Sequence, residues 1–200
     1  MKKVSAIITT YNSEKSLLRV INSITNQQGI NTDFTVELII VDDCSTDTTR
    51  AILEENNIPY LSTPKNSGGP NAGRNIGLKA ATGDYICIVD HDDEWHSNKV
   101  LSLLPHFDKA SIVTSGYTVV DNSTGKTIDR VNPCPTGNNS LFYNTNTTFK
   151  ARLTKQLQGQ LTYLGSIMYK SNLKHILFEE EYGVVDFDWL LKLFHNYRHR

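Results

Sequence analysis

Three aspartates fall within four positions in the segment Asp90-His91-Asp92-Asp93, directly after the apolar run from Tyr85 to Val89. Carboxylates packed this closely repel one another unless a cation holds them. Aspartate oxygens suit hard cations such as Mg²⁺ or Mn²⁺, which keep several waters and also bind substrate phosphates. The segment therefore predicts a divalent-cation site, and a solvated acidic turn is the alternative.

A second acidic pair, Asp42-Asp43, follows the apolar run from Val36 to Val41. In a nucleotide site, a carboxylate at the end of a strand can accept hydrogen bonds from a ribose hydroxyl or a base N–H. The alternative is that the pair stabilises the N-terminus of a helix that we expect to begin at Ser45. The two aspartates can divide these roles between them.

The glycine-rich segment from Gly68 to Asn75 lacks two familiar nucleotide signatures. Pro70 occupies the second glycine position of GxGxxG, and Arg74-Asn75 replaces the Lys-Ser/Thr of a P-loop. A helix that begins at Pro70 and carries Arg74 still suits an anion or a nucleotide. The alternative is a turn followed by a surface arginine.

Asp186 and Asp188 flank Phe187 just before an apolar stretch. Acidic residues commonly open helices, because they cap the free N–H groups and complement the helix dipole. These two residues by themselves predict a helix start and no chemistry.

The elements that position these residues alternate along the first half of the chain. We predict strands over 4–9, 36–41, 59–62 and 85–89, separated by helices that begin at Asn12 or Ser13, at Ser45 and at Pro70. This alternation predicts an α/β fold with a mostly parallel sheet covered on both faces. Ligands bind beyond the carboxyl ends of such strands, where both acidic segments fall.

The pattern changes after Trp95. We predict a helix over 97–106, strands over 111–120, 127–131 and 163–169, helices over 149–157 and 171–177, and a final helix from Asp186 with Leu190, Leu191 and Phe194 as its apolar face. The aperiodic stretch 132–148 is expected to be a long loop that orders when substrate binds.

Composition excludes several functional classes. The 20 basic and 21 acidic residues nearly cancel and form no basic run, so we expect no binding to nucleic acid or to a membrane surface through a polybasic patch. No stretch reaches the length of a membrane-spanning helix. Three cysteines without CxxC spacing argue against disulfides and zinc, and indicate a reducing cytoplasm.

Four segments in this order resemble family 2 of the glycosyltransferases, which have the GT-A fold with a Rossmann-like half. They are Val4 to Asn12, Glu37 to Asp47, Gly73 to Gly77 and Gly83 to Asp93. The resemblance implies a single catalytic domain over 1–200, with a nucleotide-sugar-binding half (1–95) and an acceptor-binding half (96–200). It implies inverting transfer from a nucleotide-diphosphate sugar, a UDP-sugar by preference, to a hydroxyl of a glycan or lipid-linked saccharide, with Mn²⁺ or Mg²⁺ as cofactor.

The resemblance also implies a role for each matching position. Asp93 is the expected metal ligand, with help from Asp92, and His91 is expected to contact donor or acceptor because it replaces a small residue. The implied nucleotide contacts are Thr9, Thr10, Tyr11, Asp42, Asp43, Arg74 and Asp92.

The general base of the family is the Asp of a Glu-Asp pair placed before a helix. The stretch from Val185 to Leu193 matches that pattern with Asp186 at the base position. Val185 stands where the family has Glu, so Asp188 remains a rival for the same role.

Two other functions remain open. A nucleotidyltransferase of similar architecture would carry a glycine-rich loop after the first strand, where Thr9 to Ser13 has no glycine. An inactive module that binds nucleotide sugar or carbohydrate is favoured by Val185 and opposed by the retained Asp92, Asp93 and Asp186. We also expect a chain that continues past residue 200, with peripheral attachment to the inner face of the membrane through those later residues.

Overall fold

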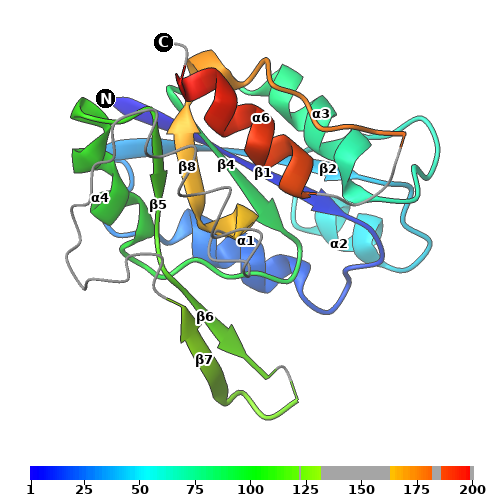
Figure 1. Cartoon of the computed structure of the whole chain (residues 1–200). Coiled ribbons are helices and arrows are strands. Elements are labelled where there is room, and N and C mark those ends of the chain that lie inside the picture. Colours follow the sequence, from blue (N-terminus) through cyan, green and yellow to red (C-terminus); the bar gives the residue numbers. More distant parts are fainter. Residues whose placement is uncertain (122, 132–162, 182–185, 199–200) are drawn as a thin grey trace.

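The computed structural model describes residues 1–121, 123–131, 163–181 and 186–198 (Figure 1). The loop expected over 132–148 and the helix expected over 149–157 lie outside these residues. The strands are β1 (Lys2–Thr10), β2 (Phe34–Asp42), β3 (Tyr60–Ser62), β4 (Tyr85–Asp90), β5 (Ile112–Thr114), β6 (Tyr117–Val120), β7 (Thr127–Val131) and β8 (Ile167–Lys170). The α-helices are α1 (Leu17–Thr25), α2 (Thr49–Glu55), α3 (Pro70–Ala80), α4 (Lys99–Leu103) and α6 (Asp186–Arg198).

One six-stranded sheet with the order β3-β2-β1-β4-β8-β5 forms the centre of the molecule. The first four strands pair in parallel, which confirms the predicted α/β class. β8 runs antiparallel to both β4 and β5. The sheet therefore draws strands from both halves of the chain.

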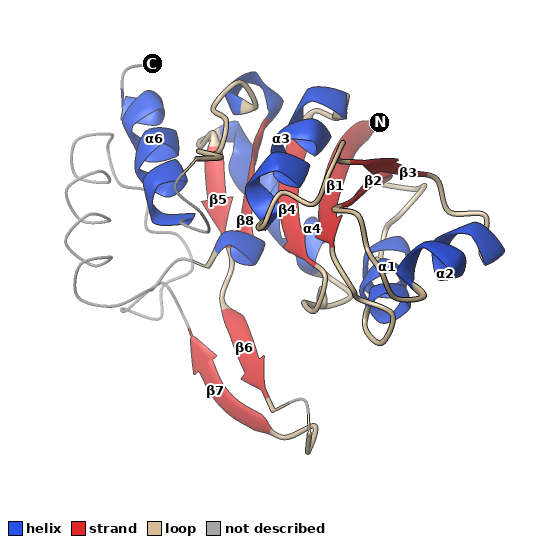
Figure 2. Ribbon diagram, turned by 90° about the vertical axis from the view of Figure 1, so that its right-hand side faces the viewer, coloured by secondary structure: helices blue, strands red, loops and turns tan. Residues whose placement is uncertain are grey.

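Alternation along the central strands builds two apolar layers. Ala6, Ile8, Cys87 and Val89 face the layer that contains α1, α2 and α4, and Ile7, Ile86 and Ile88 face the layer that contains α3 and α6. Figure 2 shows α6 to the left of the strands and α1 and α2 to their right. This double cover explains why the strands read as continuous apolar runs in the sequence.

Two predicted helix starts are wrong by several residues. Helix α1 begins at Leu17 and α2 at Thr49, and neither has a side-chain cap. Asn12 and Cys44 adopt positive φ values of 51° and 60°, so the chain turns before each helix. The Asn12 carboxamide accepts from the Thr46 N–H at 2.8 Å, which joins the two turns instead of capping a helix.

The second half departs further from the sequence prediction. The stretch 111–120 forms two short strands, and β6 pairs with β7 in a hairpin that projects from the body (Figures 1 and 2). Residues 164–166 and 171–173 form 3₁₀ turns on either side of β8, where a longer strand and a helix were predicted.

Helix α6 packs on the α3 side of the sheet. Trp189, Leu190 and Leu193 are buried there, and Leu191 is only half-buried, which corrects the predicted apolar face. The Phe194 side chain lies outside what the structure describes. Within the described residues, no helix combines the length and apolar character needed to cross a membrane.

Candidate functional site

The parallel strands bring the predicted site residues to one edge of the sheet. Thr10 lies opposite Asp42 across the β1–β2 pair, and Thr9 lies opposite Asp90 across the β1–β4 pair. The Asp43 N–H donates to the Thr10 carbonyl at 2.8 Å and extends this register by one residue. Residues that are as much as 81 positions apart in sequence, such as Thr9 and Asp90, thus meet at the carboxyl ends of β1, β2 and β4.

The acidic turn after β4 contains a carboxylate that is poorly satisfied. Burial, together with the neighbouring Asp90 and Asp92 carboxylates, raises the pKa of Asp93 to about 6, although contact with the Tyr163 hydroxyl opposes the shift. The Asp93 Oδ2 atom is buried and has no hydrogen-bond partner. An anionic oxygen left in this state is destabilising unless a cation approaches it.

The residues at this turn suit a cation that shares its coordination with a substrate. In the described part of the chain, no three His, Cys, Asp or Glu side chains converge to hold a metal ion on their own. A small divalent cation is commonly bound by one or two carboxylates together with waters and substrate phosphates. The free Asp93 Oδ2 and the exposed Asp92 fit that kind of site.

The pair Asp42-Asp43 divides into two different environments. Asp42 is fully buried and accepts from the Ser45 N–H and from Arg50 Nε, so its carboxylate is engaged within the protein. Asp43 accepts from Thr63 Oγ1 at 2.7 Å and from the Ser67 hydroxyl at 2.9 Å. Asp43 therefore also fixes the loop before α3, a role that the sequence did not indicate.

Arg74 joins two parts of the site that lie far apart in sequence. Its Nη2 donates to Asp90 Oδ1 at 2.8 Å and its Nη1 to Asp186 Oδ1 at 2.6 Å. The arginine side chain is 3% exposed. Asp186 therefore lies at the same edge as the acidic turn, whereas the surface arginine considered as an alternative is wrong.

Asp188 has a different position from Asp186 although only two residues separate them. Its carboxylate pairs with Lys192 Nζ at 2.6 Å, one turn along α6, and its side chain is 48% exposed. Positions two apart on a helix point to different sides. Of the two rivals, Asp186 is the one that the fold directs toward the other site residues.

Buried polar atoms without partners gather around this edge. Among the described residues they include Thr10 Oγ1, Arg74 Nε, His91 Nδ1 and Asp93 Oδ2. Unpaired buried polar groups are uncommon, and a ligand is one explanation for them.

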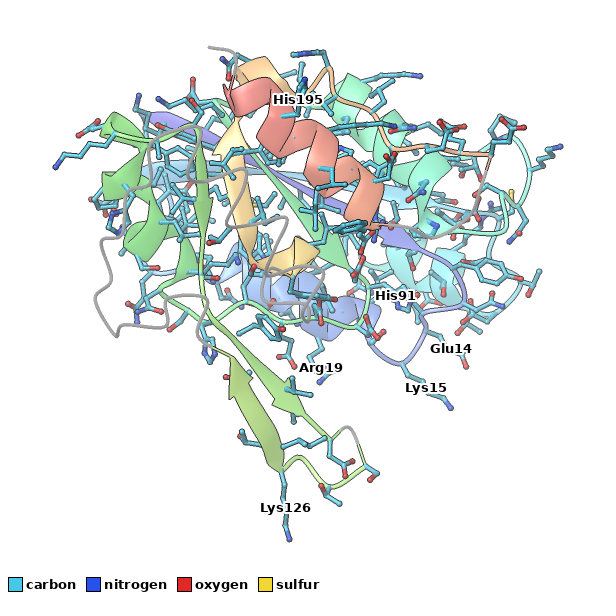
Figure 3. All side chains as sticks on the ribbon, viewed as in Figure 1. Glu14, Lys15, Arg19, His91, Lys126 and His195 are labelled. Atoms are coloured by element: carbon cyan, nitrogen blue, oxygen red, sulfur yellow. The ribbon has the colours of Figure 1, made fainter. Side chains whose placement is uncertain are left out.

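Two further predicted site residues lie in the loops at this edge. His91 lies in the loop beyond β4 (Figure 3). Tyr11 directly follows β1 and is 44% exposed.

Two further residues at the site were not predicted. The Tyr163 hydroxyl donates to Asp90 Oδ2 at 2.9 Å. The Lys99 ammonium donates to the Gly165 carbonyl at 2.9 Å and lies 5.5 Å from the Trp95 ring centroid, and burial lowers its pKa. No motif marks either residue. Tyr163 reaches the site because β8, which follows it, runs antiparallel to β4, and Lys99 is the first residue of α4.

The chain matches the model of glycosyl transferase family 2 over residues 5–175. It is similar to the poly(ribitol-phosphate) beta-N-acetylglucosaminyltransferase TarS of Staphylococcus aureus (strain Mu50), with 43% identity over 97 residues. That alignment covers 46% of this chain and 17% of TarS. A poly(ribitol-phosphate) beta-glucosyltransferase of Bacillus spizizenii is 39% identical over 104 residues, which is 50% of this chain and 16% of that protein. The chain thus spans about a sixth of the length of these two relatives.

Solved structures support the same fold. The crystal structure of S. aureus TarS 1-349 has a TM-score of 0.71 and 26% identity, covering 97% of this chain and 56% of that one. The same protein in complex with UDP has a TM-score of 0.70, with 26% identity, 97% of this chain covered and 55% of that chain.

Proposed function

Since the chain belongs to glycosyl transferase family 2, we propose that it transfers a sugar from a UDP-sugar to a hydroxyl group of a glycan or lipid-linked saccharide. The S. aureus relative binds UDP in its crystal structure. A related structure of that protein contains UDP-GlcNAc. These relatives make UDP-GlcNAc the first donor to test.

The observation that carries this proposal is the position of Asp186. Its carboxylate is held by Arg74 at the edge of the sheet where the Asp90–Asp93 turn lies. In the proposed transfer, one carboxylate binds the cation that holds the donor diphosphate, and a separate carboxylate takes the proton from the acceptor hydroxyl. Carboxylates that could take both roles lie at one edge of the sheet, which supports the proposal.

We assign Asp93 and Asp92 to the donor side by an unpaired oxygen and by exposure, and Asp43 and Thr9 to Tyr11 by their place at the ends of β2 and β1. Asp93, assisted by Asp92, would hold a divalent cation, and when bound this ion offsets negative charge on the departing diphosphate. Asp43 and the backbone of Thr9 to Tyr11 contact the uracil and ribose. His91 lies in the turn itself, where it contacts donor or acceptor.

Asp186 serves as the general base on the acceptor side. It takes the proton from the acceptor hydroxyl while that oxygen attacks the anomeric carbon. A new carbon–oxygen bond forms as the bond to the diphosphate oxygen breaks, and UDP leaves. Direct displacement inverts the anomeric centre, so no second nucleophile from the protein is required.

Two asparagine variants test the base assignment. Asp186→Asn keeps an oxygen that can accept from Arg74 but removes the proton acceptor. We expect turnover to fall by about 10²–10⁴-fold with UDP affinity unchanged. Asp188→Asn is the matched control because it lies on the same helix, faces solvent and pairs with Lys192.

The readout is UDP release from UDP-GlcNAc, with an acceptor or by slow donor hydrolysis. Loss of turnover in Asp188→Asn but not in Asp186→Asn would move the base to Asp188. UDP binding by the wild-type protein with no turnover of any UDP-sugar would favour the inactive binding module.

A further inference from the structure

We infer that Arg74 is a positioning residue that holds the base Asp186 in place, with Asp90 as the counter-charge that fixes Arg74. This inference rests on the proposed role of Asp186. The two terminal nitrogens of Arg74 donate to different carboxylates, Asp186 at 2.6 Å and Asp90 at 2.8 Å. Arg74 comes from α3, Asp90 from the end of β4 and Asp186 from the start of α6.

The surroundings leave the guanidinium little freedom. Its side chain is 3% exposed, its Nη1 also donates to Asn71 Oδ1 at 3.2 Å, and its Cζ lies 5.1 Å from the centroid of the Phe178 ring. A buried charge needs fixed partners, and the planar fork of arginine can address two groups at defined angles. A lysine at this position would keep the charge and lose that geometry.

The charge balance argues against direct contact between Arg74 and a diphosphate. One guanidinium already serves two carboxylates, so the trio carries excess negative charge if both acids are ionised. Both of its terminal nitrogens are engaged, and only its Nε is left without a partner among the described residues, buried within the protein. A diphosphate placed there would meet Asp90 and Asp186 as well as Arg74, and like charges would repel it. We therefore expect Arg74 to contact the base Asp186 and not the nucleotide.

The contact with Arg74 determines which oxygen of Asp186 is available. Oδ1 accepts from the guanidinium, and Oδ2 has no such contact with a described residue, so we assign Oδ2 as the atom that takes the acceptor proton. On the other side, Asp90 Oδ2 accepts from the Tyr163 hydroxyl at 2.9 Å. Asp186, Arg74, Asp90 and Tyr163 thus form a continuous chain from the base to the turn that carries Asp93. This chain sets the base relative to the donor, and a displacement of about 1 Å can lower a rate by about 10²-fold.

Substitution of Arg74 separates positioning from nucleotide binding. In Arg74→Gln we expect turnover at saturating donor to fall by about 10²-fold, with the Kd for UDP in Mn²⁺ within about twofold of wild type. Arg74→Lys should retain the fold and still lose most of the turnover, because it keeps the charge without the fork. Lys192→Gln is the control, since it removes an ion pair on the same helix away from the site.

A loss of UDP affinity equal to the loss of turnover would overturn the inference and make Arg74 a nucleotide contact. Full activity in Arg74→Lys would also overturn it, because charge without geometry would then suffice. An equal loss of turnover in Lys192→Gln would overturn the inference as well, because any disturbance of α6 would then lower turnover to the same extent.

The contact can be tested without turnover. The unfolding free energies of Arg74→Gln, Asp186→Asn and the double variant should be non-additive, because each single change removes one charge of the same ion pair. Additive losses would contradict the inference. Failure of the proposed function has a different signature, namely wild-type protein that neither binds UDP nor consumes a UDP-sugar.

Discussion

The Asp93 carboxyl is buried beside two other carboxylates, and its pKa rises to about 6 from the usual 3.8. A raised folded-state pKa means that the stability contributed by this group is complete below about pH 4 and is lost as the pH rises through about 6. At neutral pH the ionised Asp93 therefore destabilises the free protein. Carboxyl groups with a perturbed pKa are common at functional sites, and a bound cation would offset the charge of the ionised Asp93.

Replacement of Asp93 by asparagine should make the free protein more stable. At about pH 7.5 we expect Asp93→Asn to raise the unfolding free energy by about 1–2 kcal/mol, after allowance for solvent screening. The gain should disappear toward about pH 4, where the wild-type carboxyl is protonated. Denaturant unfolding at the two pH values measures both effects.

Asp92→Asn is the matched control for this experiment. Asp92 is exposed one position earlier in the same turn, so its replacement should change stability by less than about 0.5 kcal/mol. No gain for Asp93→Asn at the higher pH would show that Asp93 is already satisfied in the free protein.

At the scale of elements, α3 positions Arg74 because two glycines let the helix lie directly on β1. A Cβ atom added at Gly77 would lie 2.3 Å from Ile7 Cγ2, and one added at Gly73 would lie 2.9 Å from Thr9 Cγ2. Both distances are too short for an alanine without movement of the helix or the strand. The close approach brings the first turns of α3 beside the ends of β1 and β4.

Gly77→Ala should destabilise the protein although alanine favours helices. Glycine to alanine inside an unobstructed helix stabilises by about 1 kcal/mol. Here the overlap with Ile7 should reverse the sign and cost about 1–3 kcal/mol. Lys79→Ala, at an exposed position of the same helix, is the control and should change stability by less than about 0.5 kcal/mol. A more stable Gly77→Ala variant would contradict the packing described for α3 and β1.

The first half of the fold could be predicted from the sequence because buried parallel strands leave long apolar runs between turns. The runs that end at Val41 and Val89 placed both acidic segments at strand ends. The helix starts could not be predicted in the same way, since Asn12 links two loops through backbone N–H groups of residues distant in sequence. The helix propensities of single residues carry no information about such tertiary contacts.

The second half shows a larger departure for a similar reason. The stretch 111–120 reads as one run of strand-forming residues. In the structure the chain leaves the six-stranded sheet after β5 and then forms β6, which pairs with β7 in a hairpin. Tyr163 meets Asp90 only because β8 is inserted antiparallel between β4 and β5, which places the start of β8 near the end of β4. Strand order is a property of the whole fold, and no local pattern in the sequence specifies it.

At the scale of the whole molecule, the site is assembled from stretches of chain that are far apart in sequence. In the described part of the chain they are the ends of β1, β2 and β4 with the residues that follow them, the first turns of α3, the start of α4, the segment before β8 and the start of α6. In the proposed function, the donor side gathers around Asp93, and the acceptor side is defined by Asp186, which Arg74 links to Asp90. We propose that this edge of the sheet binds a nucleoside diphosphate together with a cation.

Calorimetric titration of UDP into the protein with Mn²⁺, and again with EDTA, is the decisive test of this joint binding. The diphosphate must approach the Asp92 and Asp93 carboxylates, and like charges oppose this approach when no cation is present. We therefore expect the affinity with Mn²⁺ to exceed that in EDTA by at least about tenfold, and Asp93→Asn to lose the difference. Equal affinity under both conditions, or no binding with Mn²⁺, would show that this edge does not bind the diphosphate through a cation.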